Sequence, residues 1–246
     1  MIPEICKKFW YDSFIDPFDK TDQQKGLPVP IGEIPFDEIA LIDLPNPKNL
    51  KFNSFDLSNF IDNRRTVRKY ENKPISLSEL SFLLWATQGL AKNMSDERSL
   101  RTVPSAGGRH AFETVILVNR VEGLERGIYR YIVSKHKLLA LDFGNEEIED
   151  LISGFRNINL LANSAATFLW IALPERMTWK FNERGYRYLL LDAGHICQNL
   201  YLAAEAVDCG CCGIGAFDDE EVNKVLKLDE NECFLAYAAS VGKVTK

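Results

Sequence analysis

The sequence is poor in histidine and in basic charge, and it has no long uninterrupted apolar run. Three histidines in 246 residues are too few and too scattered for a metal site or a Ser-His-Asp triad. A formal net charge of −6 argues against a general nucleic-acid-binding surface. The longest apolar run, residues 160–173, is interrupted by Asn163 and Ser164 and is too short to span a bilayer. We therefore expect a soluble cytoplasmic protein with neither nucleic acid nor membrane as a partner.

The six cysteines form no recognisable metal or disulfide pattern. They are Cys6, Cys197, Cys209, Cys211, Cys212 and Cys233. The close group at 209–212 has the wrong spacing for a zinc pair, and no second cluster accompanies it. A cytosolic chain of this size needs no disulfide staples, so we expect small buried thiols and no bound metal. The alternative is a metal protein that uses these cysteines.

Proline is concentrated in the first part of the chain. Pro28, Pro30, Pro35, Pro45 and Pro47 break any long helix or strand there, and hydrophobic periodicity is weak. Residues 1–60 are therefore predicted to form an irregular arm that lies on the body or on a partner. The remaining residues, 61–246, are predicted to form the main domain. The whole chain has ordinary globular composition, with 46% hydrophobic residues, and its length allows one large domain or two small ones.

A long helix is predicted in the second half of the sequence. Residues 184–207 have apolar side chains around the whole helical cylinder, which indicates a helix buried on most of its circumference. It would be about 36 Å long, enough to cross a small domain or to reach a second subunit. His195, in its middle, is expected to be a packed core residue rather than a ligand. The Cys/Gly-rich stretch that follows is expected to form a tight turn.

Shorter helices and strands surround this helix. Ser76, with Glu79 three residues later, predicts a capping box that opens a helix ending near Gly89. Asp218 predicts the start of a further capped helix. Strands are predicted at residues 114–119, 127–133, 137–141, 165–173 and 234–241, a helix at 146–155, and a loop at 92–103. Hairpins interleaved with helices indicate the α+β class, with one sheet flanked by helices.

Three short segments could bind a ligand. Arg64, Arg65 and Arg68 flank Thr66 in RRTVRKY, and guanidinium groups fork onto phosphate oxygens. The alternative for this segment is a solvated basic turn. PSAGGRH (residues 104–110) and GIGAF (213–217) contain small residues that let backbone N–H groups approach a ligand, although each could equally be a surface loop. No GxGxxG fingerprint is present, and together the three segments point to a bound phosphorylated cofactor.

Several segments occur in an order that resembles one known family. These are RRTVRKY with PISLSELSFLLWATQGL, RTVPSAGGRHAFE, EGLERGIYRY, WKFNERGYRYLLLDAGHICQNLYLAAEA and GIGAFDDEEVNKVL. Together they resemble the nitroreductase-like flavoproteins, and within that family the SagB-type dehydrogenase branch. The resemblance covers residues 60–243 and leaves the arm outside. It implies an α+β fold with a mostly antiparallel central sheet, an intertwined homodimer, and FMN in a cleft between the subunits.

The resemblance also implies which residues hold the cofactor. The phosphate, ribityl chain and pyrimidine edge would be held by Arg64, Arg65, Thr66 and Arg68. The flavin ring would be reached from the other subunit by Pro104, Ser105, Ala106 and Gly107. The turn Gly213, Ile214, Gly215 and Ala216 would supply a backbone N–H to flavin N5, from Gly215 or Ala216. Lys243 would complete the phosphate site, with Lys246 as the alternative.

The same resemblance suggests catalytic residues and one departure. Enzymes of this branch that oxidise peptide azolines have a Lys-Tyr pair, whereas here Lys180 and Arg184 are kept and Phe181 lacks the phenol. We predict an FMN-dependent oxidoreductase that transfers hydride through flavin N5 by a ping-pong mechanism, with NAD(P)H as donor. The alternatives are an azoline dehydrogenase that uses Lys180 as its base, and a flavin-binding protein without enzymatic activity.

Overall fold

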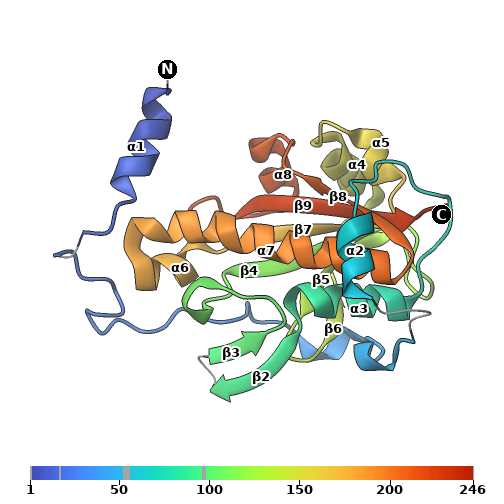
Figure 1. Ribbon diagram of the computed structural model, residues 1–246, viewed down its shortest axis with the longest axis horizontal. Helices are drawn as coiled ribbons and strands as arrows, with labels where there is room; N and C mark the ends of the chain where they lie inside the picture. Colours follow the sequence, from blue (N-terminus) through green and yellow to red (C-terminus); the bar gives the residue numbers. More distant parts are fainter. Residues whose placement is uncertain (1, 17, 52–55, 96–97, 246) are drawn as a thin grey trace.

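The protein is built around a seven-stranded sheet in which every neighbouring pair of strands is antiparallel (Figure 1). The computed structural model describes residues 2–16, 18–51, 56–95 and 98–245. In pairing order the strands are β1 (Leu41–Asp43), β6 (Lys137–Ala140), β5 (Gly127–Ile132), β4 (Phe112–Val118), β7 (Ala166–Ala172), β9 (Phe234–Lys243) and β8 (Cys209–Ile214). The predicted α+β fold with a mostly antiparallel sheet is confirmed.

Both faces of the sheet are buried, each under its own layer of helices. Along β4, Val115 and Leu117 face one core while Ile116 and Val118 face the other, which is the two-residue alternation of a strand. The larger core lies under α3 (Leu77–Gln88) and α7 (Gly185–Ala206). The smaller core lies under the helices α4 (Asn145–Ser153), α5 (Ile158–Ala162) and α8 (Asp219–Val225). Burial on both faces explains the continuous apolar runs of β4 and β7 in the sequence.

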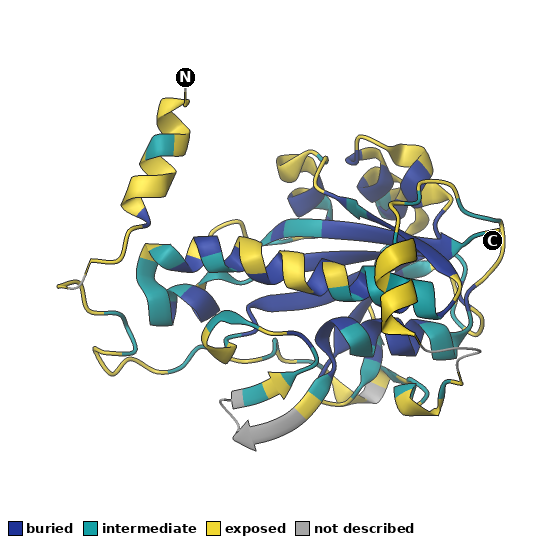
Figure 2. Cartoon of the chain, viewed as in Figure 1, coloured by how far each residue is buried: buried dark blue, intermediate teal, exposed yellow. Residues whose placement is uncertain are grey.

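The predicted long helix is confirmed to within one residue at each end, as α7. Most of its circumference is buried, and residues such as Ile196 and Leu200 belong to the larger core. One stripe is open to solvent and contains Leu190, Leu191 and His195 (Figure 2). The prediction that His195 is a packed core residue is therefore wrong. His195 follows Leu191 by four residues, so helical periodicity places it on the same exposed face.

The predicted capping box at the start of α3 is confirmed. Ser76 Oγ accepts a hydrogen bond from Glu79 N–H at 3.2 Å, and Glu79 Oε2 accepts one from Ser76 N–H at 2.8 Å. The helix ends where predicted, with Gly89 as its C-cap residue. Glycine fits there because a methyl group would lie 2.3 Å from the Trp85 side chain. Asp218 caps α8 and accepts a hydrogen bond from Glu221 N–H.

Two segments predicted to be irregular form strands instead. The Cys/Gly-rich stretch after α7 is β8, and it pairs with β9 along its whole length. Small residues are needed there because neighbouring side chains pack directly on the strand: a methyl group at Gly210 would lie 2.7 Å from Val67. The predicted loop at 92–103 overlaps a two-stranded sheet of β2 (Leu90–Ser95) and β3 (Arg98–Arg101). Its polar sequence gives no apolar alternation, so periodicity could not predict it.

The N-terminal arm is more regular than predicted. It starts with the helix α1 (Glu4–Asp12), supplies β1 to the edge of the main sheet, and ends at α2 (Leu57–Asn63). Leu41 of β1 pairs with Leu139 of β6, so this part of the arm belongs to the body. The division into an arm and a domain at residue 60 stays a prediction. Figure 1 shows α1 extending away from the rest of the protein.

Candidate functional site

The basic segment lies along the outer edge of β8. Val67 N–H donates to the Cys211 carbonyl at 2.9 Å, and Thr66 forms a parallel bridge to the same residue. The Thr66 hydroxyl lies 3.2 Å from the hydroxyl of Tyr201 on α7, which accepts a hydrogen bond from Gly213 N–H at 2.8 Å. Tyr201 therefore connects the basic segment with the glycine-containing turn, although the two lie far apart in the sequence.

The arginines of this segment have no carboxylate partner among the described residues. Arg64 is partly buried, and its guanidinium carbon lies 5.4 Å from the centroid of the Tyr201 ring. Arg65 and Arg68 are exposed. Their positive charge is consequently available to an anionic ligand such as a phosphate.

Lys243 differs from these arginines. Its Nζ lies 2.5 Å from Glu79 Oε1 and donates to the Val207 carbonyl at 2.9 Å. Lys243 therefore already forms an ion pair with the Glu79 carboxylate. The role of Lys243 in a phosphate site stays a prediction. Lys246, the alternative, lies outside the described residues.

The turn after β8 exposes backbone donors. Gly213 must be glycine, because a methyl group there would lie 2.4 Å from the Tyr237 hydroxyl. Ile214 is buried and ends the strand, whereas Gly215 and Ala216 are exposed. No described residue accepts a hydrogen bond from the N–H group of Gly215 or Ala216. These two N–H groups can therefore donate to a ligand.

The loop at 104–108 is held by a buried carboxylate. Asp192 on α7 is 3% exposed, accepts a hydrogen bond from Ala106 N–H at 3.1 Å, and is also hydrogen-bonded to the Ser105 hydroxyl. Burial raises the pKa of Asp192, and its Oδ2 has no partner among the described residues. Ser105 Oγ in turn accepts from His110 N–H at 2.9 Å. The loop is thus fixed to α7 on one side and closed on itself, with Pro104 exposed at its start.

Lys180 and Phe181, at the end of α6 (Pro174–Phe181), lie against this loop. Gly107 has a positive φ of 59°, and a methyl group there would lie 2.8 Å from Phe181 Cζ and 3.1 Å from Lys180 Nζ. Only glycine allows the loop to approach these two side chains so closely. The structure therefore places the lysine ammonium group next to the small-residue loop, and a catalytic role for Lys180 stays a prediction.

Two further side chains extend this cluster. The rings of Phe181 and Tyr188 meet edge to face, with centroids 4.8 Å apart. Arg184 points toward the arm: its Nη1 lies 3.4 Å from the Ser13 carbonyl, and its guanidinium carbon lies 5.7 Å from the centroid of the Tyr188 ring. Arg184 therefore lies between the loop cluster and the foot of α1, and a catalytic role for it stays a prediction.

A buried ion pair anchors the other end of the loop. Arg176 Nη2 lies 2.6 Å from Glu113 Oε1, with side chains 1% and 4% exposed. The Arg176 carbonyl accepts a hydrogen bond from Arg109 Nε at 2.8 Å. Arg176 Nη1 donates a hydrogen bond to the His110 carbonyl. The guanidinium group of Arg101 is buried nearby, and this burial lowers its pKa to about 10 although Glu113 opposes the shift. Glu113 is thus the carboxylate closest to a group of buried cations.

The stability of the protein is expected to fall at acid pH through His110. Burial, helped by the positive charge of Arg101, lowers the pKa of His110 from 6.5 to about 3. In the unfolded chain the imidazole of His110 binds a proton near pH 6.5, whereas in the folded chain it stays neutral until about pH 3. The contribution of neutral His110 to the free energy of unfolding is therefore complete above pH 6.5 and is lost as the pH falls toward 3. Between pH 7 and pH 5 the wild type should lose up to about 2 kcal/mol more stability than His110→Asn.

Asparagine is the suitable replacement because His110 has a positive φ of 47°, which asparagine tolerates. The measurement is urea unfolding at both pH values. Equal losses in the two proteins would mean that His110 is not held neutral.

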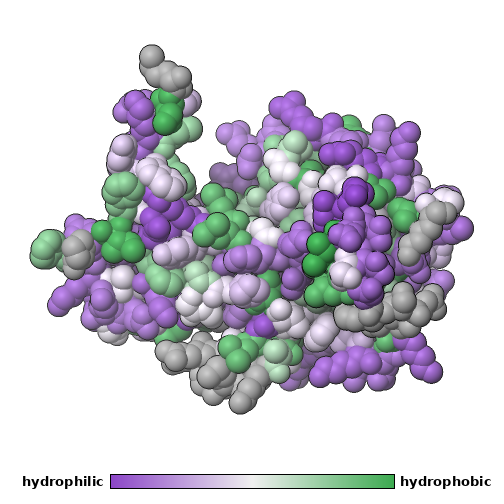
Figure 3. Space-filling view, in the orientation of Figure 1, coloured by the Kyte–Doolittle hydropathy of each residue, from purple (hydrophilic) through white to green (hydrophobic). Residues whose placement is uncertain are grey.

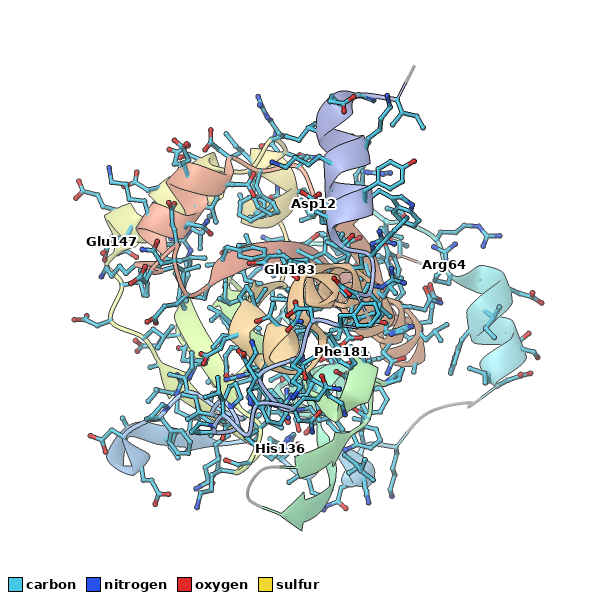
Figure 4. All side chains as sticks on the ribbon, turned by 90° about the vertical axis from the view of Figure 1, so that its left-hand side faces the viewer. Asp12, Arg64, His136, Glu147, Phe181 and Glu183 are labelled. Carbon is cyan, nitrogen blue, oxygen red and sulfur yellow. The ribbon has the colours of Figure 1, made fainter. Side chains whose placement is uncertain are left out.

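The predicted site residues form two groups, which different parts of α7 organise. Tyr201 gathers the basic segment and the glycine turn, and Asp192 holds the loop. Tyr201 follows Asp192 by nine positions, about 14 Å along the helix axis. No hydrogen bond or ring contact joins the two groups within the described part of the chain. Figure 4 shows Arg64 of the first group and Phe181 of the second at separate places.

Four of the six cysteines belong to the hydrophobic cores, namely Cys197, Cys209, Cys211 and Cys212. Cys209, Cys211 and Cys212 are free and buried, which confirms their prediction as small buried thiols. Burial raises the pKa of Cys209 to about 12, and that of Cys197 to about 11, so these thiols stay protonated at neutral pH. Within residues 2–245, apart from 17, 52–55 and 96–97, no group of three metal-ligating side chains could hold an ion. The same residues contain no helix long and apolar enough to cross a membrane.

Sequence reasoning missed the residues that organise both groups. Asp192 gave a usable signal, since a carboxylate inside the apolar stretch LLLDAG must find a partner when it is buried. Tyr201 gave none, because its role depends on β8 crossing beside α7. The Glu113–Arg176 pair likewise joins a strand to a helix that no sequence spacing relates.

Unmatched arginines, free backbone N–H groups and a small-residue loop on this α+β scaffold are features of a site for an anionic cofactor. The chain belongs to the nitroreductase family, whose model matches residues 61–243. A protein of Methanocaldococcus jannaschii named as a nitroreductase is 34% identical over 189 residues, covering 77% of this chain and 90% of that protein. The trifolitoxin-processing protein TfxB of Rhizobium leguminosarum is 29% identical over 137 residues, covering 54% of this chain. This chain spans only 37% of TfxB.

Solved structures agree with this assignment. A nitroreductase structure from Anabaena variabilis matches with a TM-score of 0.65 and 30% identity, covering 77% of this chain and 38% of that one. A nitroreductase from Desulfovibrio desulfuricans in complex with FMN matches with a TM-score of 0.55, covering 79% of this chain and 89% of that one. At 16% identity the second likeness concerns the fold alone. The predicted family and the oxidoreductase class are confirmed, while the SagB-type branch, the dimer and the nicotinamide donor stay predictions.

Proposed function

We propose that this protein is an FMN-dependent oxidoreductase that works as a homodimer, with each FMN held between a half-site from one chain and a half-site from the other. The observation that supports this most is the division of the site residues along α7. Arg64 and the free N–H groups of Gly215 and Ala216 form one half, and the loop held by Asp192 forms the other. Both halves are of a kind that FMN needs, namely cations for a phosphate and small residues for close approach to a ring.

The residues have distinct tasks in this proposal. Arg64, Arg65 and Arg68 bind the phosphate and the pyrimidine edge, and Thr66 adds a hydroxyl. The Gly215 or Ala216 N–H donates toward the ring, while Ser105 to Gly107 of the partner subunit lie against it. When bound, FMN supplies the chemistry by taking hydride from a nicotinamide and giving electrons to a second substrate in a separate half-reaction. Lys180, beside Gly107, is placed to contact that second substrate.

The protein purified as expressed is expected to be yellow and to lose its flavin absorption on anaerobic mixing with NADH or NADPH. Absorption should return when an electron acceptor is added, because donor and acceptor react in turn. Stopped-flow absorbance measures both steps. Failure of both nicotinamides to bleach the flavin band would favour a flavin-binding protein without this activity.

A second candidate is a peptide-modifying azoline dehydrogenase of the SagB type, which the similarity to a trifolitoxin-processing protein favours. Lys180 would act as the base. Phe181 lacks the phenol of that branch, but the Tyr188 ring lies against Phe181 and brings a phenol to the same cluster. A thiazoline-containing peptide that reduces the loaded wild type but not Lys180→Ala would support this candidate. Equal rates in both proteins would remove Lys180 as the base.

A further inference from the structure

One aromatic side chain of α7, that of Tyr201, contacts three different groups of the basic half-site. It is partly buried and packs against the larger core. Its hydroxyl lies 2.8 Å from the nitrogen of Gly213 and 3.2 Å from Thr66 Oγ1. Its ring centroid lies 5.4 Å from the guanidinium carbon of Arg64, a distance at which a cation is attracted to an aromatic face. A backbone turn, a hydroxyl and a cation are therefore placed relative to one another by a single side chain.

The hydrogen bonds of the Tyr201 hydroxyl have a defined direction. The N–H group of Gly213 can only donate, so the Tyr201 oxygen accepts there. The phenol has one proton of its own, and Thr66 Oγ1 is the acceptor within its reach in the described part of the chain. The Tyr201 hydroxyl is therefore satisfied in full when it donates to Thr66 and accepts from Gly213.

This direction leaves the proton of Thr66 for a ligand. Thr66 Oγ1 accepts from Tyr201, and it hydrogen-bonds to no other group among the residues that the structure describes. Thr66 is exposed, and Figure 3 shows hydrophilic groups over the end of α2, where the basic segment begins. The free side of Thr66 is thus a donor that lies beside cations. A ligand with hydrogen-bond acceptors there, such as phosphate oxygens or ring carbonyl groups, fits this position.

The glycine turn is held by the same phenol at the outer edge of β8. On this edge the Cys211 carbonyl accepts a hydrogen bond from Val67 N–H at 2.9 Å. Gly213, two residues further along, instead donates its N–H to Tyr201. The phenol therefore satisfies the last backbone donor of this strand edge, where the basic segment no longer runs alongside. It fixes the strand at the point from which the free N–H groups of the turn project.

We propose that Tyr201 is a positioning residue of the FMN site. Its hydroxyl fixes the Gly213 peptide and directs the proton of Thr66 toward an acceptor on FMN, while its ring holds Arg64. The half-site thereby selects a hydrogen-bond acceptor at Thr66. This inference rests on the FMN site of the proposed function, and it adds a residue that contacts FMN only through its neighbours.

The first test removes only the hydroxyl. Tyr201→Phe keeps the ring beside Arg64, and it should raise the FMN dissociation constant about tenfold, the scale of one or two lost hydrogen bonds. The measurement is the fluorescence of flavin released when the loaded protein is diluted. The matched control is Tyr237→Phe. The Tyr237 hydroxyl also packs on Gly213, but it hydrogen-bonds to Cys197, so its loss should change the constant less than about threefold.

The wild type decides which idea fails. If it binds FMN no more tightly than Tyr201→Phe does, the role of Tyr201 is overturned and the proposed function stands. A wild type that is folded but binds no FMN would contradict the proposed function, and this inference with it.

The second test shows whether Tyr201 acts through Thr66. Thr66→Val should raise the FMN dissociation constant about tenfold in the wild type. In the Tyr201→Phe background it should raise the constant less than about threefold, because the hydroxyl that it removes is no longer directed at the ligand. A general structural role of Tyr201 would leave the two effects independent, and their factors would multiply. Equal factors in the two backgrounds would therefore overturn the proposed action through Thr66.

Discussion

Replacement of Glu113 by alanine is expected to lower the free energy of unfolding by about 3–5 kcal/mol, the usual cost of breaking a buried ion pair from one side. The Glu113 carboxylate lies 2.6 Å from Arg176 Nη2 and accepts from Ile34 N–H at 3.2 Å, at 4% side-chain exposure. Its removal leaves the buried Arg176 guanidinium group without its ion-pair partner and takes away an opposite charge near Arg101. The midpoint of urea unfolding measures the loss.

The matched control is Glu149→Ala. Glu149 pairs with Arg126 at 2.7 Å, but their side chains are 63% and 35% exposed. Water screens this pair, so its loss should cost less than about 1 kcal/mol. Similar losses in the two variants would mean that burial does not distinguish the pairs. A double replacement of Glu113 and Arg176 by apolar residues of similar size should recover part of the loss, because the Arg176 charge is then no longer left unpaired.

The second large effect is expected when two variants that each bind FMN weakly on their own are combined in one heterodimer. Arg64→Ala removes a cation from one half-site and should weaken FMN by about 1.5–3 kcal/mol, the scale of a charged hydrogen bond. Asp192→Ala frees the loop of the other half-site from both of its hydrogen bonds. If the two halves come from different chains, a heterodimer of these variants contains one site with neither defect. One of its two sites should then bind FMN as tightly as the wild type.

The heterodimer can be isolated from co-expression with two affinity tags, and flavin absorption after dialysis gives the occupancy. The control combines Arg64→Ala with Arg68→Ala. Both defects then lie in the same kind of half-site, so each of the two FMN sites of the heterodimer keeps one defect. FMN binding should recover at neither site. Absence of recovery in the first pair as well would place the whole site within a single chain, and would contradict the proposed arrangement.

Local patterns predicted most of the helices and strands. The strands at 114–119 and 165–173 appear as β4 and β7, because burial on both faces selects the continuous apolar runs that the sequence contains. The helix at 184–207 appears as α7, because burial of most of its circumference selects the apolar residues that the sequence repeats at helical spacing. The same reasoning failed for β8, whose cysteines and glycines have little strand propensity and are required only by the side chains packed on them.

The candidate site was predictable as segments but not as a geometry. Runs of arginine and of small residues mark Arg64 to Arg68 and Pro104 to Gly108 as places where a ligand could bind. Periodicity does not reveal that Asp192 fixes the loop, or that Tyr201 connects the basic segment with Gly213. It also suggested a core role for His195, which lies on the open stripe.

The sequence by itself determined the α+β class, most element boundaries and the residue types that could bind a phosphate, because these depend on short-range periodicity and side-chain chemistry. Only the tertiary structure decided which segments meet. It separated the site residues into two groups along α7, matched the charge of Lys243 with Glu79, and left one face of α1 and one stripe of α7 uncovered. These results depend on contacts between residues far apart in the chain, and the packing of whole elements fixes such contacts, not local propensity.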